Sequence, residues 1–381
     1  MNKIPKVILL LETSRAFGRG LLYGIARYSK LNGPWSFYRE PRSLKTAIPH
    51  LAKWNANGII MRNSVISRQL MDLKLPTIVV IHETSGMDDS PHVVTDSESI
   101  VRLAAEHLLS KGLRHFAYCG IDEFIWSEER KRIFRRLMTD AGYATHVFER
   151  SRLKNVRSWE DEQSSIESWI RTLPKPIGIM TCNDDRAQHV LEACKITGFR
   201  VPEDVALIGV DNDVLLCDLS DPPLTSVALN TESAGYYAGE LMDRLMKGEP
   251  MNGQEIVVKA THVVVRQSTD ILALDDANVA AAIRFIRQNA KKKIFVDDVV
   301  FHTSLSRRSL EAHFRETIHR SIHEEIRRVR TEQISKMLIE TTMPISEITS
   351  MFNFTDVEHI SRFFRKEKGI GPREYRKINR R

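Results

Sequence analysis

Residues 345–366 read I-S-E-I-T-S-M-F-N-F-T-D-V-E-H-I-S-R-F-F-R-K. The apolar side chains at 345, 348 and 352 share one face of a short helix, and Ile360 and Phe364 lie four residues apart on a second helix. Asn353, Phe354 and Thr355 stand between these two patterns, and asparagine is a common turn residue. The stretch therefore predicts a helix-turn-helix.

A second motif of this kind precedes it, at residues 297–317. Asp297–His302 predicts a short helix and Thr303–Leu305 predicts a turn. Ser306 is a favourable N-cap for the next helix, which we expect to begin at Arg307. One match to this motif is a weak signal, but two in tandem are a much stronger one.

The second helix of each motif has one buried side and one outward side. Leu310 and Phe314 form the buried side in the first motif, as Ile360 and Phe364 do in the second. A long helix, about Ser321–Glu340, has the length to hold the two motifs about one helical turn of DNA apart. The outward positions, where a helix in the major groove presents side chains to base edges, are Arg307, Arg308, Glu311, Ala312 and Arg315 in the first motif and Asp356, Glu358, His359, Ser361 and Arg362 in the second.

The net charge of the chain lies with these motifs. The 381 residues carry a formal charge of +7, and residues 275–381 hold 22 Lys+Arg against 15 Asp+Glu, whereas residues 1–274 hold 34 of each. A basic excess confined to a small helical region is typical of a surface that binds phosphates. Charge alone would fit a solvated helical face equally well. The two motifs favour nucleic acid.

Several stretches around the second motif resemble a known family signature. They are I-S-E-I (345–348), F-T-D (354–356), F-F-R-K (363–366) and G-I-G-P-R-E-Y-R (369–376). Residues 279–381 therefore resemble the DNA-binding domain of the AraC/XylS transcription regulators, which implies that they bind a double-stranded DNA operator.

Three positions depart from the pattern of that family. Ser304, Asn353 and His319 stand where the family usually has glycine. Because serine tolerates a left-handed backbone less well than asparagine does, we expect slight strain in the first turn, at Ser304.

The first 270 residues show a different texture, in which short strand-like runs alternate with amphipathic helical stretches. This alternation predicts parallel sheets covered by helices, an α/β class. The expected strands are Val7–Leu11, Trp35–Tyr38, Gly58–Met61, Thr77–Ile81, His115–Tyr118, Gly178–Thr181, Val205–Val210 and His262–Val265. The expected helices include 97–111, 130–141, 186–197 and 232–247. We expect a domain over 1–270, a linker at 271–278 and an all-α domain over 279–381.

The first domain also resembles a known family. The stretches that carry this resemblance are 104–117, C-N-D-D-R-A (182–187), 198–213, P-P-L-T-S-V (222–227) and V-V-V-R-Q-S-T (263–269). They resemble the effector domain of LacI/GalR repressors, which has the fold of type-1 periplasmic sugar-binding proteins. The resemblance implies a two-lobed sensor with Rossmann-like lobes and a small sugar as effector, xylose or a related one.

Polar side chains at the ends of elements are the candidate sugar ligands. Vicinal hydroxyls suit carboxylate, amide and guanidinium groups backed by an aromatic ring. By the resemblance, Asp211, Asn183 and Arg130 contact sugar hydroxyls. We expect Trp126 to stack on the sugar and the loop after the first strand to close the opposite wall. The candidate set is Glu12, Ser14, Arg15, Trp126, Arg130, Asn183, Asp184 and Asp211.

Some of these candidates have competing interpretations. Asp184 and Asp204 fit helix caps better than ligands. Arg130 also fits one end of a surface ion pair, and Trp126 also fits a core position.

Other classes of site find little support in the sequence. The four cysteines include no C-x-x-C pair, and no nucleophile–base set or Gly-rich phosphate loop is evident. His319 and His323 lie four apart but suggest a surface pair rather than a metal site, since no third ligand is evident. No apolar run reaches the ~20 residues of a membrane span, and the first apolar stretch is shorter than a secretory signal requires. We expect no enzyme activity, cofactor or metal.

The combined expectation is a cytoplasmic transcription regulator that responds to a sugar. We expect a homodimer that activates a carbohydrate catabolic operon and contacts RNA polymerase, although the sequence does not itself distinguish activation from repression. A regulator that responds to a non-sugar small molecule is one alternative. A transport-type solute-binding protein is another, and the basic helical domain argues against it. A DNA-repair alkyltransferase, which also occurs fused to an AraC-like module, would need an activated cysteine.

Overall fold

The structure is a computed structural model that describes residues 4–39, 54–62, 73–80, 90–122, 124–149, 159–250, 253–270 and 276–379. The chain divides into two compact regions, Met1–Ile271 and Leu272–Arg381, called here the N-terminal and C-terminal regions. Residues 271–275 of the expected linker and Ile81 of an expected strand lie outside the described residues. The last two linker residues begin helix α10, Ala277–Gln288.

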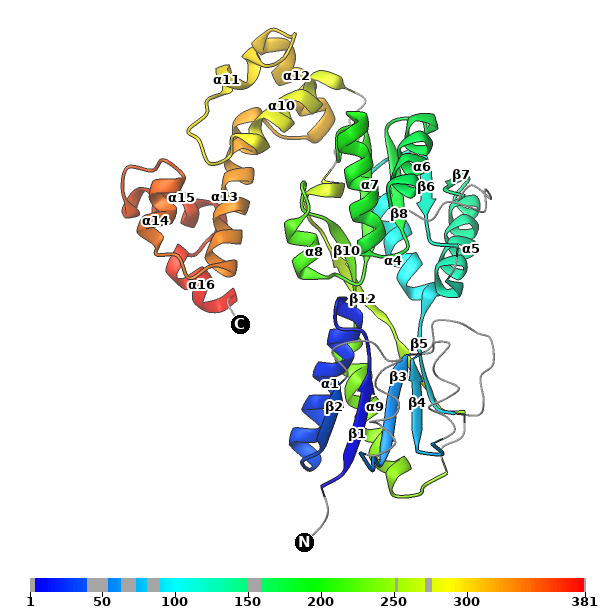
Figure 1. Cartoon of the computed structure of the whole chain (residues 1–381). Coiled ribbons are helices and arrows are strands. Elements are labelled where there is room, and N and C mark those ends of the chain that lie inside the picture. Colours follow the sequence, from blue (N-terminus) through cyan, green and yellow to red (C-terminus); the bar gives the residue numbers. More distant parts are fainter. Residues whose placement is uncertain are drawn as a thin grey trace. The chain divides into compact units, whose positions relative to one another are not determined.

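The N-terminal region contains two six-stranded sheets, each the centre of one lobe (Figure 1). In the first lobe all neighbouring strands are parallel. Their order is β11 (Glu255–Val258), β5 (His92–Thr95), β4 (Thr77–Val80), β3 (Gly58–Arg62), β1 (Lys6–Leu10) and β2 (Ser36–Arg39). The carboxyl ends of these strands therefore share one edge of the sheet, where ligand crevices form in α/β folds.

The second lobe has the same plan with one antiparallel strand. The order is β12 (Ala260–Val264), β10 (Thr225–Leu229), β9 (Val205–Val210), β8 (Ile177–Thr181), β6 (Phe116–Cys119) and β7 (Thr145–Val147). Only β12 among these strands runs antiparallel to its neighbour. All residues of β6, β8 and β9 are buried, as expected for parallel strands covered by helices on both faces.

Helices cover the sheets through apolar side chains. In the second lobe α4 (Ser97–Leu109) and α5 (Ile125–Asp140) pack on one face, and α6 (Trp159–Thr172) and α7 (Asp184–Thr197) pack on the other. In the first lobe α1 (Ala16–Asn32) and α9 (Thr231–Met246) pack on one face and on each other. The two helices approach so closely that a Cβ at Gly24 would lie 2.0 Å from the Glu232 carbonyl oxygen.

The chain passes between the lobes three times. It crosses at Asp96 between β5 and α4, at Asn230 between β10 and α9, and at Lys259 between β11 and β12. Backbone hydrogen bonds tie the crossings together, from Asp96 to Val258 (2.8 Å) and from Asn230 to Lys259 (3.0 Å). The lobes are therefore joined by a hinge of three chain segments.

The predicted α/β class and the eight expected strands are confirmed, with ends that match or are shifted by one or two residues. The prediction missed β5, β7, β10 and β11, which are short and contain polar residues. It also placed Arg130 at the start of a helix, and this is wrong, because α5 begins at Ile125 and Arg130 lies in its second turn.

The N-terminal region ends in a buried cluster of hydrogen-bonded hydroxyl groups. The short 3₁₀ helix η1 (Gln267–Thr269) places Ser268 and Thr269 in the second lobe with no exposed surface. The Ser268 hydroxyl donates to the Leu207 carbonyl (2.6 Å). The Thr269 hydroxyl forms hydrogen bonds with the Thr225 hydroxyl and with Nε2 of His107 (both 2.8 Å).

The C-terminal region is built of helices in the order α10, α11 (Val296–Phe301), α12 (Arg307–Ile318), α13 (Ile322–Glu340), α14 (Ile345–Met351), α15 (Val357–Lys368) and α16 (Pro372–Asn379) (Figure 1). Two separate apolar clusters form its core. The first contains the N-terminal half of α13 with α10, α11 and α12, and the second contains the C-terminal half of α13 with α14 and α15.

Both predicted helix-turn-helix motifs are confirmed. Ser306 caps α12, since its hydroxyl accepts from the Ser309 backbone N–H (3.3 Å). Leu310, Phe314, Ile360 and Phe364 are fully buried.

The expectation of strain at Ser304 is wrong, because this residue lies outside the left-handed region and donates to the Asn278 side chain through its backbone and hydroxyl groups. Of the three positions where the family usually has glycine, His319 (φ 55°) and Asn353 (φ 53°) are left-handed.

No helix of the described residues is both long enough and apolar enough to cross a lipid bilayer.

Candidate functional site

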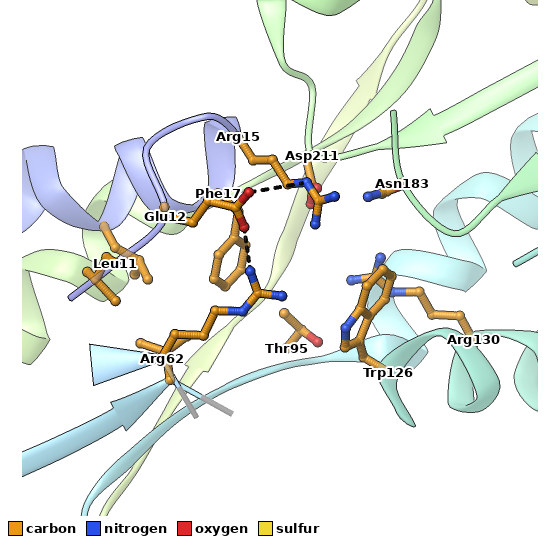
Figure 2. A pocket seen from close by; sticks show the side chains of 13 residues that line it. Leu11, Glu12, Arg15, Phe17, Arg62, Thr95, Trp126, Arg130, Asn183 and Asp211 are labelled. Carbon is orange, nitrogen blue, oxygen red and sulfur yellow. Dashed lines mark hydrogen bonds and ion pairs between the residues drawn. The ribbon is translucent and has the colours of Figure 1, made fainter. Parts of the chain in front are cut away.

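A pocket opens between the two lobes of the N-terminal region, at the carboxyl ends of their strands (Figure 2). Its empty space, including the part open to solvent, is about 630 Å³. The lining residues are Leu11, Glu12, Arg15, Phe17, Gly18, Leu21, Arg62, Val80, Thr95, Trp126, Arg130, Asn183 and Asp211. Six of the eight predicted ligand residues are among them.

The first lobe supplies a carboxylate held between two arginines. Glu12 follows β1, pairs with Arg62 at the end of β3, and lies 3.9 Å from Nε of Arg15. Burial raises the pKa of Glu12, but the hydrogen bond from Ser14 and the positive charges of Arg15 and Arg62 outweigh it and hold this pKa below its ordinary value. Gly18 lets the loop fold back, because a Cβ there would lie 1.8 Å from the Glu12 carbonyl oxygen. This wall therefore presents an ionised acceptor.

The second lobe supplies an arginine under an aromatic ring. Arg130 is 3% exposed, and its guanidinium lies 4.9 Å from the centre of the Trp126 ring. It also donates to the Cys182 carbonyl, which fixes the side chain on the floor of the pocket. Trp126 stacks on Phe124 with 16° between the ring planes. The surface-ion-pair interpretation of Arg130 therefore does not describe this structure.

Asn183 caps α7 and lines the pocket with the same side chain. Its Oδ1 accepts from the Arg186 backbone N–H (3.0 Å), and its Nδ2 donates to Asp185 (3.1 Å). Because the oxygen is engaged by the helix, the nitrogen is the end directed into the pocket (Figure 2). Asn183 therefore acts toward a ligand as a donor.

Asp211 follows β9 in a left-handed conformation, with φ of 103°. Burial raises its pKa to about 7; Arg130 and Arg15 lower it, while Asp185 and Asp213 raise it. A hydroxyl that donates to the carboxylate would favour its ionised form. Asp211 thus places at the pocket a carboxyl whose pKa lies near neutral.

Two ion pairs join the lobes beside the pocket. Arg15 of the first lobe pairs with Asp185 of α7 at 2.6 Å, and Arg19 of α1 pairs with Asp213 at 2.6 Å. The backbone N–H of Ala16 donates to the same Asp213 oxygen (2.9 Å). Closure of the lobes is therefore fixed at one side of the pocket by charged contacts.

Two predicted ligand residues lie outside the lining. Ser14 donates its hydroxyl to the Glu12 carboxylate and so holds that carboxylate in position. Asp184 is 2% exposed and accepts from the Asp213 backbone N–H (2.7 Å) and the Ser226 hydroxyl (2.6 Å). Burial, with the charge of Asp211, raises the pKa of Asp184 well above its ordinary value. Asp184 therefore holds the Asp211 loop rather than facing the pocket.

The sequence prediction missed several lining residues, above all Arg62. This arginine directly follows the predicted strand 58–61, at the same sheet edge as Glu12. Its position at a carboxyl strand end was the available signal. Phe17, Thr95 and Val80 gave no comparable signal.

The four cysteines are all buried. Burial raises the pKa of Cys182 to about 11 and that of Cys194 to about 12, and it raises those of Cys119 and Cys217 further. A thiolate is therefore disfavoured at each of them. Within the described ranges, no group of three or more His, Cys, Asp or Glu side chains could hold a metal ion.

The first recognition helix, α12, presents a basic surface. Arg308, Arg315 and Ala312 are exposed, and no carboxylate of the described residues pairs with either arginine. Arg307 instead pairs with Asp297 (2.9 Å) and with Glu311 (3.1 Å). Two of the three predicted arginines are thus unpaired within the described chain.

The second recognition helix, α15, differs at its start. Asp356 is its N-cap and accepts from the His359 backbone N–H (2.6 Å), so its carboxylate stabilises the helix. Its pKa is lowered by this bond and by one from Thr355. Glu358, His359 and Arg362 are exposed, and Ser361 is half-buried with its hydroxyl bonded to the Val357 carbonyl.

The comparisons with known proteins cover both regions. Residues 105–269 match the model of a periplasmic binding protein-like domain, and residues 301–378 match that of a helix-turn-helix domain. The chain is 31% identical to the xylose operon regulatory protein of Escherichia coli K12, over 99% of this chain and 98% of the relative. The chain belongs to the family of this regulator.

Two further comparisons extend the similarity. The xylose operon regulatory protein of Haemophilus influenzae is 30% identical, over 97% of this chain and 98% of the relative. A solved structure of a xylose-binding transcription activator is 31% identical, with a TM-score of 0.82 over 100% of both chains. As a member of the xylose operon regulator family, the chain is a transcription regulator with a LacI-like sensor and an AraC-type DNA-binding domain. Both resemblances noted from the sequence are confirmed.

Proposed function

We propose that this regulator binds a small sugar, xylose or a related pentose, between its two lobes and activates a carbohydrate catabolic operon. The observation that carries the proposal is the set of side chains in the pocket. Carboxylates, guanidinium groups and an amide converge there beside an indole ring, which suits the hydroxyls and the apolar face of a sugar. The relatives named for xylose support this choice of sugar.

Seven of the lining residues have a proposed role. Glu12 and Asp211 accept from sugar hydroxyls, while Arg15, Arg62, Arg130 and Asn183 donate to them. Trp126 stacks on the sugar ring. Ser14 and Asp184 support Glu12 and the Asp211 loop without touching the ligand.

The sugar acts by changing the relative stability of two lobe arrangements. It shifts the equilibrium only as far as its affinities for the two arrangements differ. The pocket walls belong to different lobes, so a sugar that touches both walls binds the closed arrangement more tightly. In our proposal this closure sets the spacing of two DNA-binding domains in a homodimer, in the cytoplasm, and thereby the contact with RNA polymerase. No catalytic step is proposed.

The recognition helices read the operator with different side chains. Arg308 and Arg362 contact base edges, and Arg307 and Arg315 bind phosphates. Glu311, Ala312, Glu358, His359 and Ser361 complete the two surfaces. Asp356 acts through the start of α15, which it caps.

Thermal-shift titration of the full-length protein tests the choice of sugar. Xylose, other pentoses and hexoses would be compared, each over a wide concentration range. A true effector at about a hundred times its Kd stabilises the folded state by about 2.7 kcal/mol. A pentose that produces this shift supports the proposal, and stabilisation only by a ligand without vicinal hydroxyls would contradict it. DNase footprints with and without that pentose then test whether the sugar changes occupancy of the operator.

A further inference from the structure

Arg330 lies in the middle of α13, the helix that joins the two helix-turn-helix motifs. It is 7% exposed, an unusual position for an arginine of a small DNA-binding domain. None of the predicted DNA contacts includes it. A buried guanidinium needs acceptors for its N–H groups, and those acceptors show what it holds.

The acceptors lie in the segment that leads into the first motif and within the second motif. On one side Nη1 donates to the carbonyls of Ala290 (3.2 Å) and Lys292, in the segment between α10 and α11. On the other side Nη2 donates to the Phe352 carbonyl (2.7 Å), at the end of α14. One planar group therefore joins the segment that leads into the first motif to the second motif.

Aromatic rings complete the second side of this site. The guanidinium carbon lies 5.0 Å from the centre of the Phe354 ring and 6.0 Å from that of Phe352. Asn353 adds a hydrogen bond from its side chain to the Lys291 carbonyl (3.2 Å), between the same two segments. Segments 290–292 and 352–354 thus meet over Arg330, and we call this arrangement the Arg330 clamp.

The apolar clusters of the described residues do not join the two motifs directly. Their apolar cores are separate, and α13 contributes Ile326 and Val329 to the first and Ile334 and Leu338 to the second. Arg330 and the buried Thr331 stand between these two pairs. A single helix can bend or twist, and apolar contacts are not directional, whereas hydrogen bonds from a planar guanidinium are.

We propose that Arg330 is a positioning residue that sets the spacing and the angle of the two recognition helices on DNA. It acts through the backbone of the segment that leads into the first motif and of the second motif, and it does not itself touch DNA. The inference deepens the DNA-reading function of this family and predicts a strict requirement for the distance between the two operator subsites. An insertion of one base pair moves one subsite by about 3.4 Å and turns it by about 35°.

The test compares full-length variants on operators of different spacing. The operator is first selected in vitro from random duplexes with the wild-type protein, and then one base pair is inserted or deleted between its subsites. Arg330→Met keeps the length of the side chain and removes every donor, and Arg330→Lys keeps the charge without the fork. Arg327→Met is the control, because Arg327 pairs with Glu367 of α15 and reaches only the second motif.

We expect wild type and Arg327→Met to lose at least about tenfold in affinity on either change of spacing. Arg330→Met should bind the original operator about tenfold more weakly and distinguish the spacings by less than about threefold. An Arg330→Met protein that retains the wild-type spacing preference would overturn the inference. Failure of the wild-type protein to select any duplex would instead count against DNA reading itself.

A second measurement needs no operator. All four native cysteines are buried, so spin labels can be placed selectively at Glu316→Cys on α12 and Lys366→Cys on α15. We expect a narrow distance distribution in the wild-type background and a clearly broader one with Arg330→Met, with Arg330→Lys between them. Equal widths in all three backgrounds would also overturn the inference, and circular dichroism would show that the variants keep their helices.

Discussion

The sugar pocket and the recognition helices both use arginine, but they leave it in different states. In the pocket Arg15, Arg62 and Arg130 are each bound to a carboxylate or a carbonyl of the protein itself. On the recognition helices Arg308 and Arg362 are exposed and pair with no carboxylate of the described chain. The difference matches the two kinds of partner. A neutral sugar needs donors held in fixed directions. DNA instead supplies phosphates, which become the ion-pair partners of an exposed arginine.

The comparison also separates two sources of binding free energy. A pre-organised pocket loses little side-chain entropy when a sugar enters, so that specificity depends on direction. An exposed arginine gains mainly from phosphate and from release of counterions, so that its contribution depends on salt. The following experiments test this difference between the pocket and the DNA-binding surface.

The largest effect should come from removing the sensor. A fragment that begins at Leu272 retains both apolar clusters and Asp276, whose carboxylate caps α10. It should fold and bind a half-site, but it should bind a full operator about 10²–10⁴-fold more weakly than the intact protein in its proposed dimeric form, because linked binding is lost. Fluorescence anisotropy on half and full operators measures this. Equal affinities of fragment and intact protein for the full operator would show that the sensor contributes no linkage.

Asp211→Ala should remove most of the sugar affinity. A lost hydrogen bond to a charged group costs about 1.5–3 kcal/mol, or roughly 10–150-fold in Kd. DNA affinity without sugar should stay nearly unchanged. Isothermal titration with xylose checks the loss, and Asp204→Ala is the matched control, because Asp204 pairs with Arg200 within the second lobe. A variant with wild-type sugar affinity would exclude Asp211 as a ligand.

The arginines of the recognition helices should differ in what they do. Arg308→Ala or Arg362→Ala should cost about 1–3 kcal/mol on the operator and relax specificity at one or two base pairs. Arg307→Ala should weaken operator and random duplex alike and reduce the salt dependence by about one unit, since phosphates carry no sequence information. Binding to operator and random DNA over a salt series measures both. Equal losses on the two duplexes for Arg308 and Arg362 would contradict base reading.

The smallest effect should be the pH dependence of sugar binding. Because the pKa of Asp211 is raised to about 7, its carboxyl is mostly protonated near pH 6 and mostly ionised near pH 8. If the sugar requires the ionised form, affinity should rise about tenfold over this range. Asp211→Asn should bind weakly and show no such rise. A flat profile in the wild-type protein would mean that the neutral carboxyl binds sugar equally well.

Stability without sugar should follow the opposite direction. The folded state holds the Asp211 proton more tightly than the unfolded chain does, because burial raises the pKa. The contribution of this group is therefore fully present below its ordinary pKa, and it is lost as the pH rises through about 7. Thermal unfolding of wild type and Asp211→Asn would separate this group from others.

Local patterns predicted the helix-turn-helix motifs almost to the residue. Caps such as Ser306 and apolar pairs such as Ile360 and Phe364 act within a few residues of each other, so a single sequence shows them. The main strands of the sensor were predicted for the same reason. Strands β5 and β11 were missed, because their pairing with each other spans more than 150 residues and leaves no local pattern, although β5 also pairs with β4.

The candidate site was predicted in part. Asp211, Asn183 and Glu12 follow strands, and this position is visible in the sequence. Asp184 stands beside Asn183 with the same chemistry, but one residue further along the helix start turns its carboxylate toward the core. The Arg330 clamp could not be predicted, because its partners lie 22 to 40 residues away and are backbone carbonyls, which any residue carries.

The cluster of hydroxyl groups around Thr269 has a consequence for how regulators with a sensor and a DNA-binding domain arise and can be engineered. The sensor bonds the Thr269 side chain inside its second lobe, whereas Asp276 caps α10 and bonds to His313 within the DNA-binding domain. A junction between Thr269 and Asp276 therefore lies outside these two sets of hydrogen bonds. A gene fusion at this point would join two proteins that already fold, so that one recombination event could place an existing operator under a new chemical signal. The same junction is where sensors could be exchanged by design.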